Sequence, residues 1–280
     1  MDKKLLIPGY YLFYSRLKRK SELFSLLYVY PLFLFGIIYI SKDFLFLNYF
    51  ITFILGMIIW ISSYEIGYLE NDVFTIKKEK NPTLRISEDK IQSIEKNFSK
   101  IRFFKIGISV LGIGALYFMD KQGFIECNLL FFLIGMLLSR SSFYAHNTLR
   151  SRWNIVTYFF LSTTKYLSIT VLFLDFKIAY STFLTVALLF PLPRTLEHAA
   201  KVKYGLNTYS KWIGNLDTFR LKYYTVAVLI GLLIYYFSNL PNHSVPLFGA
   251  LWFFAFRMGI FILLQWGAYK RTNFSSHKWD

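Results

Sequence analysis

Carboxylate and amide side chains recur at the end of a long apolar segment, in a pattern that could bind a metal ion and phosphate. Glu65, Asp72 and Glu79 are spaced by seven, so on a continuous helix successive members would lie only about 20° apart around the axis. Asn71 and Thr75 would lie beside this acidic stripe. Mg²⁺ takes one or two protein carboxylates and leaves its other positions to water and phosphate oxygens. The pattern therefore predicts a magnesium site; the alternative is a helix end that these side chains merely solvate.

A second charged segment, PLPRTLEHAAKVKYG, has a proline where the first turn of a helix favours one and a glycine where a C-terminal cap fits. We expect a short helix here. Arg194, Glu197 and Lys201 would share one of its faces, while Lys203 would lie elsewhere on its surface. A cationic face with one acid suits the binding of phosphate oxygens. The alternative is an interfacial helix whose lysines contact anionic lipid headgroups.

Transmembrane helices must position both segments, because the chain is too apolar for an ordinary soluble domain. Of its 280 residues, 55% are hydrophobic and 21% are aromatic. Eight apolar runs are candidates to cross about 30 Å of hydrocarbon, although some of them are short. They cover residues 23–40, 44–63, 101–119, 124–138, 153–174, 178–190, 223–237 and 245–266. The sequence predicts one all-α domain, residues 1–280, that forms a transmembrane bundle of eight helices with a ninth left open.

The 32 lysines and arginines, set against 16 acids, are distributed unequally among the predicted loops. Nearly all lie before the first helix, in alternate loops that include a long one from residue 77 to 105, and in the tail. The opposite loops keep only Lys42, Lys121 and Lys177. The positive-inside rule then places both termini and both charged segments in the cytoplasm. Orientation accounts for the basic charge, so nucleic acid is not a predicted partner, and a single cysteine excludes an internal disulfide.

Two cations fall well inside predicted spans, Lys165 in the fifth helix and Arg257 in the eighth. Charged side chains are costly in a bilayer and usually face a polar cavity or a partner. We therefore expect one of the two to reach the phosphate site. The alternative is a side chain that extends to the interface or binds a backbone carbonyl.

The order of these elements resembles that of the UbiA superfamily of intramembrane transferases. The chain has a basic N-terminal segment, an acidic motif after the second helix, YAHNTLRSR before the fifth, and a second charged motif after the sixth. The first family motif is N-D-x-x-D-x-x-x-D, and this chain has Asn71, Asp72, Thr75 and Glu79 at those positions. The middle carboxylate is thus a threonine, and the last is a glutamate.

Two further motifs are similar to the decaprenyl-phosphate phosphoribosyltransferase branch of this family. One is the N-P-T-L-R that ends at Arg85, and the other is the R-x-x-E formed by Arg194 and Glu197. The resemblance implies a UbiA-like bundle in a membrane, the bacterial inner membrane being the expected one. It also implies an active site on the cytoplasmic side.

The resemblance further implies a Mg²⁺-dependent transferase that acts on a diphosphate donor and a lipid acceptor. Asn71, Asp72 and Glu79 would hold the metal and, with Glu197, form the catalytic set. The residues expected to bind substrate are Thr75, Lys77, Lys78, Arg85, Tyr144, Arg150, Lys165, Arg194, Lys201 and Lys203.

Three functions remain open from the sequence. Phosphoribosyl diphosphate with a polyprenyl phosphate acceptor suits the basic loops, and its nucleophile is already an anion that needs no strong base. A prenyl diphosphate donor with an aromatic or other lipid acceptor would demand more acids in the second loop. A non-enzymatic lipid transporter or scaffold is the third reading, although matching helices broken by Gly or Pro, typical of transporters, are not found.

Overall fold

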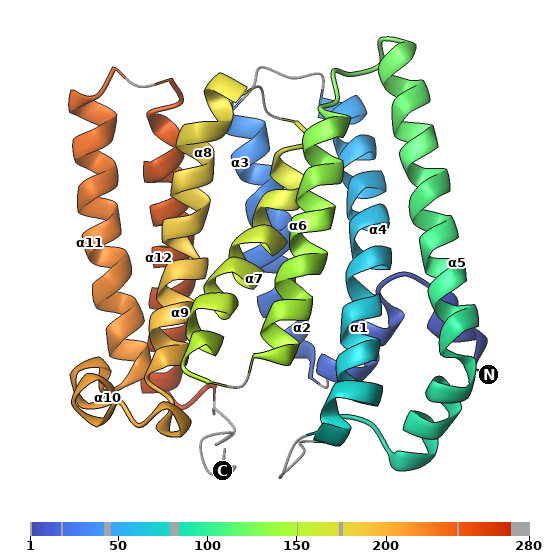
Figure 1. The fold of residues 1–280 in the computed structure, drawn as a ribbon. Helices are drawn as coiled ribbons and strands as arrows, with labels where there is room; N and C mark the ends of the chain where they lie inside the picture. The colour runs from blue at the N-terminus through green and yellow to red at the C-terminus, as the bar shows by residue number, and fades with distance from the viewer. Residues whose placement is uncertain are drawn as a thin grey trace. The chain divides into compact units, whose positions relative to one another are not determined.

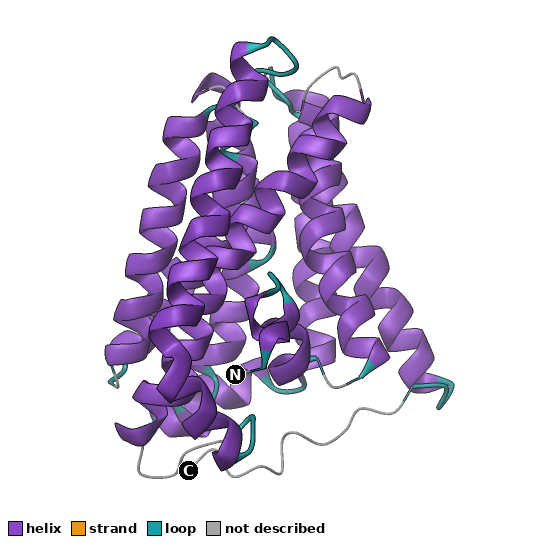
Figure 2. Ribbon diagram, turned by 90° about the vertical axis from the view of Figure 1, so that its right-hand side faces the viewer, coloured by secondary structure: helices purple, strands orange, loops and turns teal. Residues whose placement is uncertain are grey.

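The computed structural model describes residues 2–17, 19–41, 46–78, 84–149, 151–173, 176–239 and 241–269. Within these ranges the chain is almost entirely helical and contains no strand, which confirms the predicted all-α class (Figure 2). The α-helices, labelled in Figure 1, are α1 Tyr10–Arg16, α2 Lys20–Leu27, α3 Phe33–Ser41, α4 Phe46–Glu70, α5 Glu88–Lys121, α6 Leu129–Thr148, α7 Trp153–Thr170, α8 Phe176–Leu189, α9 Pro191–Ala199, α10 Asn207–Ile213, α11 Leu216–Phe237 and α12 Ser244–Gln265.

Each of the eight predicted apolar segments contains a helix. By length and composition, six helical segments of the described chain can cross a membrane. They are Lys20–Ser41, Leu47–Thr75, α5, α6, α11 and α12. Helices α7 and α8 are shorter or less apolar and do not meet both conditions. The protein is therefore a membrane protein with six candidate spans.

The prediction of a long loop from residue 77 to 105 is wrong, because most of this segment is helical. Helix α5 begins at Glu88, far ahead of the apolar run that starts at residue 101. Glu88 and Asp89 occupy its first turn, where acidic side chains complement the helix dipole. Charged residues 88–100 hid this part of the helix from a criterion based on apolar runs.

Two π-helical turns interrupt the first two membrane segments. One, Tyr28–Leu32, contains Pro31 and joins α2 to α3, because proline cannot take part in the regular ladder of helix hydrogen bonds. The other, Asn71–Thr75, continues α4 and coincides with the predicted acidic motif. Single π turns inside helices frequently occur at functional sites, so the turn Asn71–Thr75 is a candidate position for a functional site.

The chain folds as two compact units. Unit 1 comprises Met1–Arg150 and Thr164–Asp175, and unit 2 comprises Ser151–Thr163 and Phe176–Asp280. In unit 1, α4 and α5 lie side by side, and the short α1 packs against α4 (Figure 1). A buried apolar cluster joins the N-terminal segment to the end of α4 and the start of α5; it contains Leu5, Tyr11, Leu69, Val73, Ile86, Ile91, Ile94 and Ile101.

Unit 2 is built on the antiparallel pair α11 and α12, with α8 packed against α12 (Figure 1). Tyr224 of α11 is fully buried, and its ring stacks on Phe253 of α12 with a centroid distance of 5.3 Å. The Tyr224 hydroxyl donates a hydrogen bond of 2.7 Å to the carbonyl oxygen of Leu189, the last residue of α8. This tyrosine thus fastens three helices together just ahead of α9.

Glycine permits the close contact between α4 and α5, and this gives a test of the packing. A Cβ atom at Gly112 would overlap the fully buried side chain of Ile59, whereas Gly114 has open space at that position. We expect Gly112→Ala to lower the free energy of unfolding by about 1–3 kcal/mol. Gly114→Ala should be neutral or stabilising by up to about 1 kcal/mol, because alanine favours helix. Thermal unfolding in detergent compares the two; equal stability would contradict this packing.

Candidate functional site

Glu65 of α4 is a structural anchor, which corrects its predicted place in an acidic stripe. Its side chain is fully buried, and its Oε2 atom accepts hydrogen bonds from Lys105 Nζ at 2.7 Å and from the Gly9 backbone N–H at 3.0 Å. Its Oε1 atom accepts a bond of 2.7 Å from the Leu12 N–H. The carboxylate therefore satisfies free N–H groups at the start of α1 and holds that helix on α4. It cannot also bind a ligand in this arrangement.

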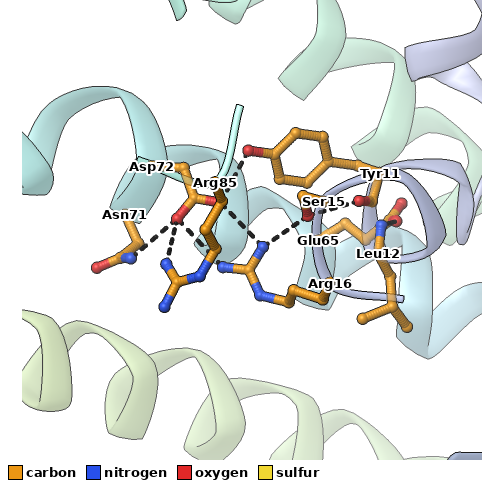
Figure 3. Close-up of polar contacts among 8 residues, drawn as sticks. All are labelled: Tyr11, Leu12, Ser15, Arg16, Glu65, Asn71, Asp72 and Arg85. Carbon is orange, nitrogen blue, oxygen red and sulfur yellow. Dashed lines mark hydrogen bonds and ion pairs between the residues drawn. The ribbon is translucent and has the colours of Figure 1, made fainter. Parts of the chain in front are cut away.

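Asp72, in the π-helical turn, is the centre of the site in unit 1 (Figure 3). Its carboxylate is 1% exposed and accepts hydrogen bonds from two guanidinium groups. Arg16 donates through Nη1 at 2.9 Å and Nη2 at 3.2 Å, and Arg85 donates through Nη1 at 2.8 Å. The Tyr11 hydroxyl donates a fourth bond at 2.8 Å. We call Tyr11, Arg16, Asp72 and Arg85 the Asp72 cluster; it carries one positive charge more than it has negative charges.

Helix α1 supplies half of this cluster and orients Arg16. The Arg16 guanidinium lies 3.8 Å from the centroid of the Tyr68 ring, a cation–π contact, and its Nη1 atom donates a bond of 2.7 Å to Ser15 Oγ. Burial raises the pKa of the Tyr11 phenol, and the neighbouring Asp72 carboxylate raises it further. Tyr11 therefore remains a hydrogen-bond donor at neutral pH.

The sequence did not reveal Tyr11 and Arg16 as site residues. They lie 61 and 56 positions before Asp72, so no periodicity links them to it. The basic segment that contains Arg16 indicated membrane orientation and contributed to the family resemblance, but neither use singled out Arg16. A tyrosine and an arginine five positions apart, just ahead of the first membrane segment, were the only available signal, and it is a weak one.

The predicted metal ligands are only partly brought together. Asn71 donates its amide N–H to Asp72 Oδ1 at 3.1 Å, and Thr75 Oγ1 donates a long bond of 3.4 Å to the Glu70 carbonyl oxygen. Glu79 lies outside the described residues. Among the residues that are described, no three His, Cys, Asp or Glu side chains gather as a metal site. Asp72 and Asn71 offer oxygens of the type that Mg²⁺ prefers, but the described cluster has a single carboxylate and favours anions.

Two other predicted substrate-binding residues of unit 1, Lys77 and Tyr144, form no hydrogen bond or ion pair with Asp72 among the described residues. Lys77 pairs with Glu95 of α5 at 2.7 Å, and both side chains are exposed. Tyr144 is exposed on α6. The Lys78 side chain and Arg150 lie outside the part of the chain that the structure describes. Among the described residues that were predicted to bind substrate, only Arg85 forms an ion pair with the Asp72 carboxylate.

Lys165 of α7 lies among tyrosine rings. Its Nζ atom is 4.8 Å from the centroid of Tyr30 and 5.9 Å from that of Tyr64. The Tyr64 ring packs edge-on against Tyr68 at 5.1 Å, and Tyr68 in turn contacts Arg16. A row of aromatic side chains thus connects Lys165 with the Asp72 cluster. Whether Lys165 reaches a bound phosphate stays a prediction.

In unit 2, Glu197 of α9 bridges two arginines in a second cluster. Arg220 Nε and Nη2 donate to its carboxylate at 2.5 and 2.6 Å, and Arg194 Nη1 donates at 2.7 Å. Burial by itself would raise the pKa of Glu197, but Arg194 and Arg220 lower it below its ordinary value. Glu197 is therefore ionised at neutral pH, and the pairing suits it to orient the arginines.

Lys201 and Lys203 lie beyond the end of α9, which corrects the predicted helical face. The helix ends at Ala199, and a 3₁₀ turn, Val202–Tyr204, follows it. Gly205 then takes a left-handed conformation with φ 65°, as a C-terminal glycine cap requires. Burial lowers the pKa of Lys201, and with the added effect of the charges of Lys203 and Arg194 it falls to about 8.

His198 forms a buried network that the sequence did not reveal. Its ring stacks on Tyr158 with a centroid distance of 4.1 Å, and its Nε2 atom lies 2.6 Å from the Tyr204 hydroxyl. Tyr204 also donates a bond of 2.9 Å to Asn154 Oδ1 at the start of α7. These contacts fasten the segment after α9 to α7, so the network serves to fix the position of Glu197.

Comparison of the chain with protein-family models, with curated proteins and with solved structures gave no match. Function must therefore be inferred from the two clusters, one in each unit. In both, a buried carboxylate bridges two arginine side chains and leaves positive charge in excess. Guanidinium groups held in this way are suited to phosphate oxygens.

Proposed function

We propose that the protein is a membrane-embedded transferase that moves a group from a diphosphate donor to a lipid acceptor, as the resemblance to the UbiA superfamily implies. The observation that carries this proposal is the contact between Asp72 and Arg85. These residues belong to the N-D motif and to the N-P-T-L-R that resembles one branch of the family. Their contact supports the reading of both motifs as parts of one donor site.

The chemistry of the Asp72 cluster suits a diphosphate. Arg16 and Arg85 can turn from the carboxylate to phosphate oxygens, and Tyr11 can hold Asp72 in place through its hydroxyl. Asn71, Asp72 and Glu79 are the residues proposed to hold Mg²⁺, which would neutralise charge on the departing diphosphate. The arginines stabilise the same charge directly, because preorganised cations at a leaving group lower the barrier.

The donor we propose is phosphoribosyl diphosphate, and the acceptor is a polyprenyl phosphate. An oxygen of the lipid phosphate forms a bond to C1 of the ribose while the bond from C1 to the diphosphate breaks, and pyrophosphate leaves. The nucleophile is an anion, so no base has to remove a proton. We place the reaction at the cytoplasmic face of a bacterial inner membrane, with both termini in the cytoplasm.

The test is donor choice by the purified protein. Given Mg²⁺ and a polyprenyl phosphate, it should consume phosphoribosyl diphosphate and form a phosphoribosyl lipid. Arg85→Ala should raise the KM for the donor by about 10- to 100-fold, since a hydrogen bond to a charged group is worth about 1.5–3 kcal/mol. Arg102→Ala, which removes an exposed arginine of α5, should leave that KM unchanged.

Two other outcomes would replace the proposal. Turnover of a prenyl diphosphate, with no turnover of the ribosyl donor, would assign the chain to prenyl transfer. Lipid flux across proteoliposomes without a covalent product would identify a transporter.

A further inference from the structure

We infer that the arginine cluster of unit 2 is a separate binding site for a single phosphate group, and that the phosphate of the lipid acceptor occupies it. The identity of the acceptor rests on the proposed function, whereas the site itself rests on contacts within unit 2. The site comprises Arg194, Glu197, Arg220 and Arg257, which we call the Glu197 cluster.

The contacts within the cluster do not satisfy the guanidinium group of Arg257. Its Nε atom is buried and has no hydrogen-bond partner among the described residues. Its guanidinium lies 5.2 Å from the centroid of the Phe256 ring and interacts electrostatically with Glu197 and Arg220. A buried donor without an acceptor is unfavourable, and a bound anion would remove that cost.

The charges of the cluster match one phosphate group. Among the residues that the structure describes, Arg194, Arg220 and Arg257 face two carboxylates, Glu197 and Asp217, and Asp217 lies 3.5 Å from Arg220. One positive charge remains, and Lys201 interacts electrostatically with Arg194 and Glu197 and can add another. Both described carboxylates already bind arginines, so the cluster suits a phosphate bound through guanidinium forks rather than a metal with a diphosphate.

The depth of Arg257 indicates that this phosphate comes from the bilayer. Helices α11 and α12 are antiparallel, so depth can be counted from the end of the pair at which α11 ends at Phe237 and α12 begins at Ser244 (Figure 1). At a rise of about 1.5 Å per residue, Arg220 lies about 26 Å along α11 from its end at Phe237. Arg257 lies about 20 Å along α12 from Ser244, so it is roughly one helical turn nearer to that end of the pair, and further from the opposite end, than Arg220. A lipid headgroup at the interface can approach this side of the cluster.

A groove in the same unit offers the competing location. It has a volume of about 830 Å³ and is lined mainly by apolar side chains of α8, α10 and α11. Among its described lining residues Lys222 is the only lysine or arginine, and no arginine of the Glu197 cluster lines it. If a phospholipid bound with its headgroup at the mouth of this groove, Lys222 and not Arg257 would contact the phosphate. Lys222 therefore provides the matched control.

The experiment measures binding to the full chain in nanodiscs, without donor and without turnover. The probe is geranylgeranyl phosphate, compared with geranylgeraniol and with inorganic phosphate. Arg257→Met should weaken binding of the phosphorylated lipid at least tenfold and leave binding of the alcohol unchanged. Lys222→Met should bind the phosphorylated lipid as the wild type does. Arg257→Lys, which keeps the charge, should recover part of the affinity and carries the test if the methionine variant does not fold.

Three results would overturn the inference. The first is equal affinity of wild type and Arg257→Met for the phosphorylated lipid. The second is loss of affinity in Lys222→Met instead, which would place the headgroup at the groove. The third is inorganic phosphate binding as tightly as the lipid, which would identify a free-phosphate site. Asp72→Asn should keep the binding of the lipid phosphate, so failure of the proposed transfer and failure of this inference can be told apart.

Discussion

Replacing Asp72 with asparagine is expected to abolish transfer from the diphosphate donor. The substitution removes the carboxylate that holds Arg16 and Arg85 together, so two guanidinium groups would repel each other within a partly buried site. It also removes the one described carboxylate proposed to bind Mg²⁺. We expect the rate of pyrophosphate release at saturating substrates to fall at least about 100-fold, the scale seen when one charge-stabilising group is deleted from an active site.

The control for this experiment is Asp89→Asn, the same chemical change at an exposed position in the first turn of α5. That variant should release pyrophosphate at the wild-type rate. Thermal unfolding of both proteins must accompany the rates, so that a loss of fold is not taken for a loss of chemistry. A folded Asp72→Asn protein with undiminished turnover would remove Asp72 from the mechanism.

The largest effect on stability is expected from Lys105→Met. Lys105 and Glu65 are both fully buried, and removing the ammonium leaves an unpaired carboxylate in the interior of unit 1. Breaking a buried ion pair from one side typically costs about 3–5 kcal/mol. We therefore expect a large fall in the midpoint of thermal unfolding, measured in detergent, whereas Lys100→Met at an exposed position of the same helix should have little effect.

A double variant distinguishes the effect of the unpaired Glu65 charge from the effect of its hydrogen bonds to α1. Glu65→Gln combined with Lys105→Met removes both charges, and buried pairs replaced by neutral groups are often tolerated. Recovery should be only partial, because a glutamine has one side-chain oxygen, whereas Glu65 uses two to accept from Gly9 and Leu12. Full loss of stability in the double variant, equal to that of Lys105→Met, would show that the unpaired charge is not the cause.

Apolar runs predicted the helices well, because a membrane span needs about 20 consecutive apolar residues and such a run can be seen directly in the sequence. All eight predicted segments contain helices, and the short helix around Arg194 and Glu197 exists. The same criterion missed the first part of α5, residues 88–100, because this part is rich in charged residues. Motif spacing also paired Arg194 with Glu197 correctly, because neighbours three apart on a helix meet.

The spacing of residues along the sequence could not predict which side chains pair with Glu65 and Asp72. Glu65 and Asp72 are seven residues apart, yet one binds Lys105 and the other binds Arg16 and Arg85. The π turn that begins at Asn71 breaks the regular periodicity on which the predicted stripe depended. Arg16 and Arg220 reach their carboxylates through tertiary packing. Only the relative placement of distant helices decides such contacts.

The anchoring of α1 has a consequence for how the protein is made. Gly9 and Leu12 are translated before the carboxylate that receives their N–H groups, which comes more than fifty positions later. Lys105, which neutralises that carboxylate, is translated forty positions later still. Helix α1 can therefore complete these contacts only after the candidate spans Lys20–Ser41 and Leu47–Thr75, and α5 as far as Lys105, have been synthesised. Tyr11 and Arg16, the first residues of the Asp72 cluster to be translated, likewise reach Asp72 only after more than fifty further positions.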